Sequence, residues 1–260
     1  MGPVPPMPSD PRGWWRSYFD DTFFQLHDAL FQESLSRTEA GAMRELLALP
    51  VGARILDAPC GWGRHTELLA EAGCVAFGAD LSLPLLARAP RRAGPDGAPR
   101  YAAADLRALP FADASFDAVI NVFTSLGLFP DDAEDVAALR EARRVLRPGG
   151  AFLLESMHRD DVIAAYAERD GWLLPDGTEV RVRRRFDPVS GISHERLRWR
   201  RGADRGRKQH ALRLRTATEI AALLAAAGFH DVAWFGDWQG RPLRYDSAHL
   251  IAVARLSRPV

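Results

Sequence analysis

Three aspartates and a glycine-containing turn stand where short apolar segments end. Asp57 is followed by the turn Cys60-Gly61-Trp62-Gly63, where glycines let a ligand approach the backbone closely. Asp80 ends the next apolar segment, and a carboxylate there can accept hydrogen bonds from both hydroxyls of a ribose. Asp105-Leu106 ends a third segment, where an acid suits an adenine amino group and a leucine suits an adenine face. The four features in this order predict a site for one adenosine.

These residues need a scaffold that brings the ends of several strands together. Apolar strand-like segments alternate with helical ones, which is typical of a doubly wound, mostly parallel sheet with helices on both faces. Ligands of such sheets lie at the carboxyl ends of the strands, and Asn121 should face the same crevice. We expect strands at 53–59, 74–80, 101–105, 116–123, 151–156, 231–236 and 248–255, and helices at 64–73, 82–89, 131–146 and 216–227.

Three further segments flank or interrupt this pattern. Apolar spacing predicts helical structure over 14–49, after a proline-rich start without regular structure at 1–13, and RRAGPDGAP at 91–99 reads as a loop. Residues 178–215 alternate apolar and charged side chains at period two, which predicts a three-stranded antiparallel insertion. The expected organisation is a helical cap at 1–49, a core at 50–157 and 216–260, and at 158–215 an inserted helix and β-meander that forms a lid or a dimer contact.

The insertion is strongly basic, with 13 basic and three acidic residues between Arg181 and Arg215. Alternation should put one set of side chains on an apolar side: Val180, Val182, Leu197, Trp199, Leu212 and Leu214. It should put another set on a charged side: Arg181, Arg183, Arg196, Arg198, Arg200, Arg213 and Arg215. Such a face could bind RNA, but the net charge of the chain is zero and does not indicate nucleic acid as a partner.

Five segments resemble the successive motifs of class I S-adenosylmethionine (SAM)-dependent methyltransferases: ILDAPCGWGRH, GADLS, AADLRALPF, FDAVINVFTSLGLF and LREARRVLRPGGAFLLE. The resemblance is strong over 50–156 and moderate over 210–255. It implies a seven-stranded sheet with an antiparallel last strand, and SAM as the cofactor. The residues that it assigns to the cofactor are Asp57, Gly61, Gly63, Asp80, Leu81, Asp105, Leu106 and Asn121.

One position departs from the family pattern. The family's loop commonly has a glycine where this chain has Pro59, and proline removes one backbone donor. A dinucleotide oxidoreductase is an alternative, but its fingerprint needs a third glycine where this chain has Thr66. Cys60 and Cys74 form no CxxC pair, so we expect no metal site.

The acceptor side is less specific. His158 follows the fifth expected strand and is a candidate general base, because its ordinary pKa suits proton transfer. Thr124, Ser125 and Tyr18 are candidates for the substrate pocket, with Trp14, Trp15 and Phe19 as further lid residues. The sequence therefore predicts methyl transfer to an O or N atom of a small molecule, with RNA methylation and a catalytically silent SAM-fold scaffold as alternatives.

The expected setting follows from what the chain does not show. No apolar run has the length of a signal-peptide core or of a membrane span, so we expect a cytoplasmic protein without membrane contact. The expected partners are a small-molecule methyl acceptor and, as a candidate, a second copy of the chain.

Overall fold

A seven-stranded sheet forms the centre of the computed structural model, which describes residues 13–28, 31–90 and 99–257. Its strands lie in the order β10-β11-β5-β4-β1-β2-β3. β11 pairs antiparallel with β10 and with β5, and the other pairs are parallel, as the sequence predicted. The strands are β1 Arg54–Asp57, β2 Val75–Asp80, β3 Arg100–Ala103, β4 Phe116–Asn121, β5 Leu146–Met157, β10 Asp231–Phe235 and β11 His249–Arg255.

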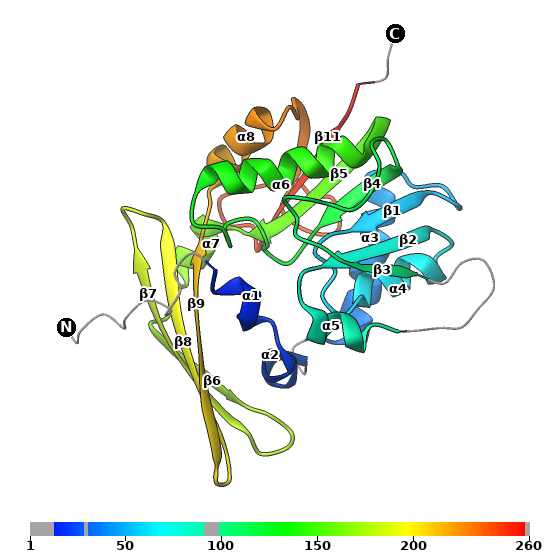
Figure 1. Cartoon of the computed structure of the whole chain (residues 1–260). Coiled ribbons are helices and arrows are strands. Elements are labelled where there is room, and N and C mark those ends of the chain that lie inside the picture. Colours follow the sequence, from blue (N-terminus) through cyan, green and yellow to red (C-terminus); the bar gives the residue numbers. More distant parts are fainter. Residues whose placement is uncertain (1–12, 29–30, 91–98, 258–260) are drawn as a thin grey trace.

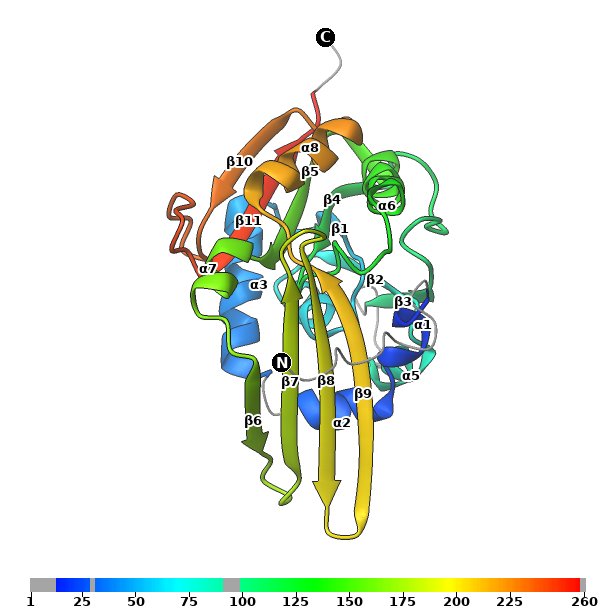
Figure 2. The same ribbon diagram turned by 90° about the vertical axis from the view of Figure 1, so that its left-hand side faces the viewer.

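Helices cover both faces of this sheet, which confirms the doubly wound architecture (Figure 1, Figure 2). α3 Glu33–Leu47 and α4 Arg64–Glu71 contribute to the buried apolar cluster on one face. α6 Asp132–Val145 and α8 Ala217–Ala226 contribute to the cluster on the other face. α5 Leu83–Arg88 follows β2. Apolar burial on both faces fixes the strands, and therefore the positions at which they end.

The carboxyl ends of β1, β2 and β4 meet at one edge of the sheet. Asp57 at the end of β1 pairs in register with Gly78 of β2 and with Ile120 of β4. Asp80 ends β2 in register with Ala103 of β3. Because neighbouring parallel strands run in one direction, the loops that follow them lie side by side. This edge faces the N-terminal helices (Figure 1).

The N-terminal segment forms three helices where one helical region was expected. α1 Trp15–Tyr18 is followed by Asp20, whose side chain accepts a hydrogen bond from the backbone N of Phe23 at 2.8 Å. An aspartate N-cap starts a new helix, α2 Asp21–His27, and so divides a stretch whose apolar spacing is uniform. The expected irregular segments at 1–13 and 91–99 lie almost wholly outside the described residues.

The insertion contains a four-stranded antiparallel sheet, so the expected three strands were one too few. β7 Glu179–Asp187, β8 Ile192–Arg201 and β9 Asp204–Arg213 are the predicted meander, and α7 Arg159–Ala164 precedes them. The additional strand, β6 Arg169–Leu173, pairs with β7 at the edge. It has mostly exposed side chains and therefore needs no apolar alternation that the sequence could reveal.

The two faces of this small sheet divide as predicted in most positions. Val180, Val182 and Leu197 are buried together with Leu26 of α2, so α2 lies on the apolar face. Arg215 contradicts the prediction of a charged outer side chain, because it is buried and pairs with carboxylates of α6. Arg213 likewise pairs with Asp132 of α6 at 2.7 Å, since the end of β9 returns to the core.

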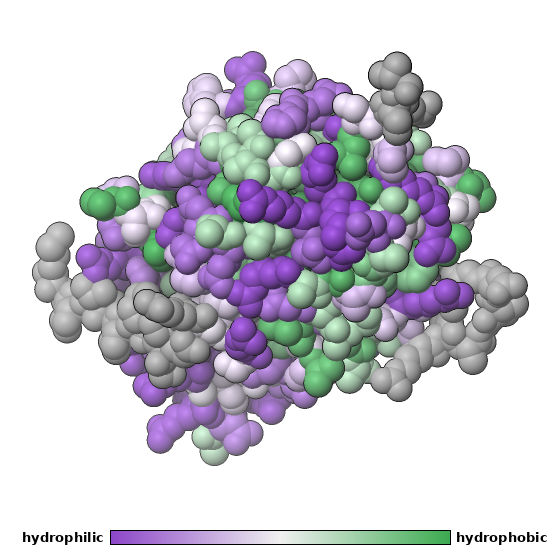
Figure 3. Space-filling model, turned by 45° about the horizontal axis from the view of Figure 1, so that its top comes forward, coloured by the Kyte–Doolittle hydropathy of each residue, from purple (hydrophilic) through white to green (hydrophobic). Residues whose placement is uncertain are grey.

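A second correction concerns the end of α6. The helix was expected to end at 146 and ends one residue earlier, at Val145, and Pro148, Gly149 and Gly150 lie inside β5. The face in Figure 3 mixes hydrophilic and hydrophobic residues without one continuous hydrophobic area. None of the helices in the described residues has both the length and the apolar run required to span a bilayer.

Candidate functional site

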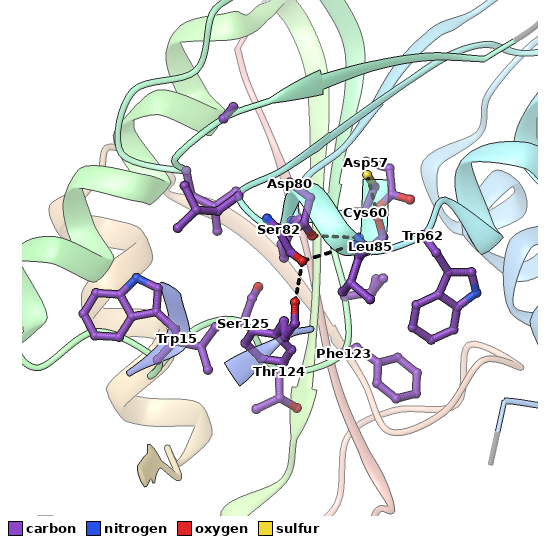
Figure 4. Close-up of a pocket in the computed structure, with 18 of the residues that line it drawn as sticks. Trp15, Asp57, Cys60, Trp62, Asp80, Ser82, Leu85, Phe123, Thr124 and Ser125 are labelled. Atoms are coloured by element: carbon purple, nitrogen blue, oxygen red, sulfur yellow. Dashed lines mark hydrogen bonds between the residues drawn. The ribbon is translucent and has the colours of Figure 1, made fainter. Parts of the chain in front are cut away.

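A pocket opens at the carboxyl ends of β1, β2 and β4 (Figure 4). It contains about 1050 Å³ of space that no protein atom fills, part of it open to solvent. Eight residues predicted from the sequence line it: Asp57, Gly61, Asp80, Leu81, Asp105, Leu106, Thr124 and Ser125.

Asp57 is the most deeply buried acid of the pocket wall, with 1% of its surface exposed. Its Oδ2 accepts a hydrogen bond from Thr66 Oγ1 at 2.7 Å, whereas its Oδ1 is buried and has no hydrogen-bond partner among the residues that the structure describes. Burial raises the pKa of Asp57 to about 7, against the opposing hydrogen bond of Thr66 and the charge of Arg64. A buried acceptor that lacks a donor is costly, so this oxygen marks a place for a donor from a ligand.

The loop after β1 bends back over β2. Ala58-Pro59 is a cis peptide, and Cys60 N donates to Ala79 O at 2.9 Å. Gly61 lines the pocket and has a positive φ of 56°, a conformation that glycine adopts without strain. Gly63 also has a positive φ, but it does not line the pocket: a Cβ there would lie 2.6 Å from Tyr101 Cε1. Gly63 therefore makes room for the Tyr101 ring.

Asp80 holds the two loops that border the pocket. Its Oδ2 accepts from Gly61 N at 2.7 Å, and its Oδ1 accepts from Ser82 N at 2.8 Å (Figure 4). Burial raises the pKa of Asp80, and these backbone hydrogen bonds oppose the rise. A carboxylate has about four lone-pair sites, so Asp80 keeps acceptor capacity for a ligand.

Asp105 already has a strong partner. Its two oxygens bind Arg107 Nε at 2.9 Å and Arg107 Nη2 at 2.6 Å, and Arg107 also pairs with Glu134. The hydrogen bonds from Arg107 lower the pKa of Asp105, so this acid is ionised over the physiological range. Arg107 fixes the carboxylate at the pocket rim beside Leu106, which lines the same wall.

Aromatic side chains form much of the remaining wall: Trp15, Phe19, Phe23, Phe31, Trp62, Phe123 and Phe129. Trp15 and Trp62 lie on opposite sides of the pocket in Figure 4. The Nε1 of Trp15 is buried and has no hydrogen-bond partner in the described part of the chain. Of the lid residues proposed from the sequence, Trp15 and Phe19 reach the pocket, and Trp14 and Tyr18 do not.

A histidine that sequence reasoning missed lines the pocket beside these rings. His65, the second residue of α4, is buried, and its Nε2 lies 2.7 Å from Glu39 Oε2. Arg64 Nη1 binds the same oxygen at 2.8 Å, which keeps Glu39 a carboxylate. Burial lowers the pKa of His65, so its ring is neutral near pH 7. With Nε2 bound to Glu39, Nδ1 is the ring nitrogen left for a ligand.

A hydrogen bond to β5 stabilises the turn after β4. Phe123 and Thr124 both have positive φ, and Glu155 of β5 accepts a hydrogen bond from Phe123 N at 2.8 Å. Ser125 lines the pocket, but its hydroxyl donates to Asn121 Oδ1. Asn121 in turn donates to Ala58 O at 2.9 Å and does not line the pocket, so its side chain supports the loop after β1.

Two other predicted site residues lie away from the pocket wall. His158 precedes α7 and is buried, with Nδ1 3.0 Å from Ser247 O and Nε2 3.6 Å from Asp160. Tyr18 is buried between α1 and β9, where its hydroxyl lies 3.0 Å from His210 Nδ1. Neither residue lines the pocket. The catalytic role proposed for His158 and the substrate role proposed for Tyr18 stay predictions.

Comparison with known proteins agrees with this geometry. Residues 55–150 match the model of a family described as a methyltransferase domain. A malonyl-[acyl-carrier protein] O-methyltransferase of Enterobacter lignolyticus is 35% identical over 129 residues, which cover 49% of this chain and 48% of that protein. A demethylmenaquinone methyltransferase of Parafrankia sp. is 37% identical over 146 residues, covering 50% and 56%. The chain thus spans about half the length of the curated relatives it matches.

Solved structures match over more of the chain. SAM-bound CalS10, an amino pentose methyltransferase of Micromonospora echinaspora, is 27% identical with a TM-score of 0.63, covering 85% of this chain and 91% of that one. The CcbJ methyltransferase of Streptomyces caelestis has a TM-score of 0.78 at 19% identity, covering 93% and 99%, a likeness of fold alone.

Proposed function

Residues 55–150 of this chain are a methyltransferase domain of the class I SAM-dependent family, and we propose that the protein uses it to methylate an O or N atom of a small molecule. SAM is the cofactor of this family. The acceptor class is supported by the largely apolar lining of the pocket, which includes seven aromatic side chains and suits a small organic ligand.

The observation that carries the proposal is the unpartnered Oδ1 of Asp57. Asp57 lines a pocket whose other acids, Asp80 and Asp105, already bind donors of the protein. The amino group of SAM is a cation with N–H donors, and it would satisfy this oxygen and favour the ionised form of the carboxylate. The residues present therefore fit the cofactor.

The two other acids suit the adenosine. Asp80 would accept hydrogen bonds from the ribose hydroxyls through the lone pairs that Gly61 and Ser82 leave free. Asp105 would accept from the adenine amino group, with Leu106 against the ring. Pro59 is compatible with this arrangement, because Gly61 keeps its N–H and Asp80 fixes it.

When bound, SAM supplies an electrophilic methyl group whose leaving group is a neutral thioether. The work left to the chain is to exclude water and to align the acceptor, which can lower a barrier by roughly 7–11 kcal/mol in favourable cases. The aromatic wall of Trp15, Trp62 and Phe123 excludes water. His65 Nδ1 is placed to accept a proton from a hydroxyl acceptor, and a neutral amine would need no base.

Calorimetric titration with SAM tests the cofactor site. Asp80→Asn should raise the Kd more than tenfold, because the amide places N–H donors where the ribose needs acceptors. Asp117→Asn is the matched control, since Asp117 lies near the opposite end of β4 and binds Arg54 N. An unchanged Kd for Asp80→Asn, or binding of NAD in place of SAM, would contradict the assignment.

Transfer of a labelled methyl group from SAM tests the activity. A cell extract separated into small molecules, RNA and protein offers all acceptor classes at once. We expect label in the small-molecule fraction with the wild type and a strong loss with Asp57→Asn. Label in RNA would favour RNA methylation, and SAM binding without transfer to any fraction would favour a silent scaffold.

A further inference from the structure

The outer face of the small sheet is a surface of arginines that have few partners among the described residues. We call the following residues the arginine face: Arg169, Arg181, Arg183, Arg185, Arg196, Arg198, Arg200, Arg205 and Arg207. Strand register puts them on one side of β6–β9, opposite the apolar side that packs on α2. Figure 2 looks onto this side, with α1 and α2 behind the sheet.

The register brings like charges directly opposite one another. Arg181 pairs with Arg198 and Arg183 with Arg196 across β7 and β8, and Arg198 also pairs with Arg207 across β8 and β9. Like charges opposite each other across strands are destabilising. A sheet that needed only solubility could alternate signs here, so this arrangement indicates a purpose beyond the fold.

Carboxylates hardly offset these charges. Within the described part of the chain the face has ion pairs only to Glu179, from Arg181 at 3.5 Å and Arg200 at 3.3 Å. Arg196 is half-buried at the middle of the face, and its Nε has no hydrogen-bond partner in the described residues. A buried guanidinium N–H without an acceptor is costly, so the fold leaves the charge at the centre of this face poorly compensated.

Other cations of the same insertion are well paired. On the inner face Arg184 binds Glu195 at 2.7 Å and Asp170 at 2.9 Å. Lys208 binds Asp20 of the N-terminal segment at 2.7 Å. The chain holds as many acidic as basic residues, so carboxylates are not scarce. They are placed elsewhere, and the molecule therefore presents one strongly basic side.

The chemistry of the face favours an acidic protein over nucleic acid. The planar forks of these arginines can bind the carboxylates of a partner in a bidentate manner, and arginine is enriched at protein interfaces. By register, no Phe, Tyr or Trp lies on this side: Trp172 and Trp199 point to the apolar face. Binding of single-stranded nucleic acid typically uses aromatic stacking, which this face lacks.

The size of the face also fits a protein partner. Three strands of nine to ten residues and the five-residue β6, at about 3.3 Å per residue and about 4.8 Å apart, give a footprint of roughly 540 Å². This is the same order as the ~800 Å² per partner of a standard protein interface. A second copy of the chain fits poorly, because a twofold contact would put arginines against arginines.

We propose that the arginine face is a docking surface for a partner protein that presents a carboxylate-rich patch. Docking would pair the opposed arginines with carboxylates, and no residue of the arginine face lines the pocket. This inference concerns a partner and does not depend on which small molecule is methylated.

The test uses labelled poly-L-glutamate as the acidic probe, with binding followed by fluorescence anisotropy at low salt. The variant R181Q/R183Q/R198Q removes three exposed arginines, and R140Q/R241Q/R244Q removes the same charge from α6 and from the loop before β11. We expect the first variant to lose about tenfold or more in affinity and the second to stay near the wild type, with binding that weakens steeply as salt rises. The first variant should melt no lower than the wild type, because it loses opposed like charges.

Four results would overturn the proposal. The first is that the wild type does not bind poly-L-glutamate in a salt-sensitive manner, and the second is that the two variants lose affinity equally. The third is that poly(U) RNA or phosphatidylserine vesicles bind more tightly than poly-L-glutamate at equal charge. The fourth is that the wild type self-associates in sedimentation and that R181Q/R183Q/R198Q abolishes this self-association. The RNA result would assign the face to nucleic acid, and the sedimentation result would assign it to a second copy of the chain.

Discussion

Replacing Asp57 by asparagine should remove most of the pH dependence of SAM binding. In the free protein burial raises the pKa of Asp57 to about 7, so much of the carboxyl is protonated below neutral pH. A bound ammonium beside the unpartnered Oδ1 favours the carboxylate and lowers that pKa. Binding then requires release of a proton, and affinity must fall as the pH falls below 7.

The magnitude follows from this pKa and from that of the ligand. An α-amino group titrates near 7.8, so the ligand is fully cationic only at lower pH. With both groups included, affinity should be greatest near pH 7.4, and the Kd at pH 5.5 should be about 15-fold higher, or about 1.6 kcal/mol. Asp57→Asn has no proton to lose and should bind more weakly at pH 7.4 but with a nearly flat profile from 5.5 to 7.4.

Calorimetry between pH 5.5 and 8.5 measures both quantities. At pH 7, titrations in phosphate and in Tris should reveal net release of about 0.4 proton per SAM bound by the wild type. Asn keeps an acceptor for Thr66, so the loop should hold its conformation. Equal pH profiles for the two proteins, or no proton release by the wild type, would refute the reasoning. Other titrating groups cannot imitate the result, because they are present in both proteins.

Three further predictions concern stability. Without ligand, the free energy of unfolding of the wild type should fall relative to that of Asp57→Asn as the pH rises from 5 to 8, because the pKa of Asp57 is higher in the folded than in the unfolded protein. Urea unfolding measures both proteins, and the same pH trend in the two would contradict this. Gly63→Ala should cost about 2–4 kcal/mol through its clash with Tyr101, whereas Gly52→Ala, with similar φ and open space, should cost about 1 kcal/mol; equal losses would show that only φ matters. Arg215→Met should cost about 3–5 kcal/mol in urea unfolding by leaving Asp135 buried without a cation, and R215M/D135N should regain part of it; a loss below about 1 kcal/mol would oppose this.

The sequence predicted the central sheet because its strands are buried on both faces and are therefore apolar along their length. It could not predict β6, an edge strand with exposed side chains, or the division of the N-terminal segment at Asp20. In each case the deciding interaction is either a backbone pairing or one capping hydrogen bond, and neither changes apolar periodicity. Arg213 and Arg215 were misplaced because β9 ends by returning to α6, a tertiary fact that alternation does not encode.

Residues at strand ends were predictable because topology alone brings them together. Asp57 and Asp80 reached the pocket for this reason. His65 was missed because its role depends on Glu39, which lies 26 positions earlier on another helix, and no spacing rule connects them. Gly63 and Asn121 occupy positions of the family motifs, but neither lines the pocket. Gly63 makes room for the Tyr101 ring, and Asn121 supports the loop after β1.

The structural sites of this protein differ from its proposed binding sites in whether their buried or crowded charges are paired with opposite charges of the chain. Arg215 with Asp135 and Arg107 with Asp105 are ion pairs whose charges are met within the chain. Asp57 and the arginine face are different, because the fold holds their charges in place at a cost and offers too few counter-groups. Since such arrangements lower stability, each is best explained by an external partner of opposite charge. If Asp57→Asn and R181Q/R183Q/R198Q both left stability and binding unchanged, unpaired charge would not be a guide to function here.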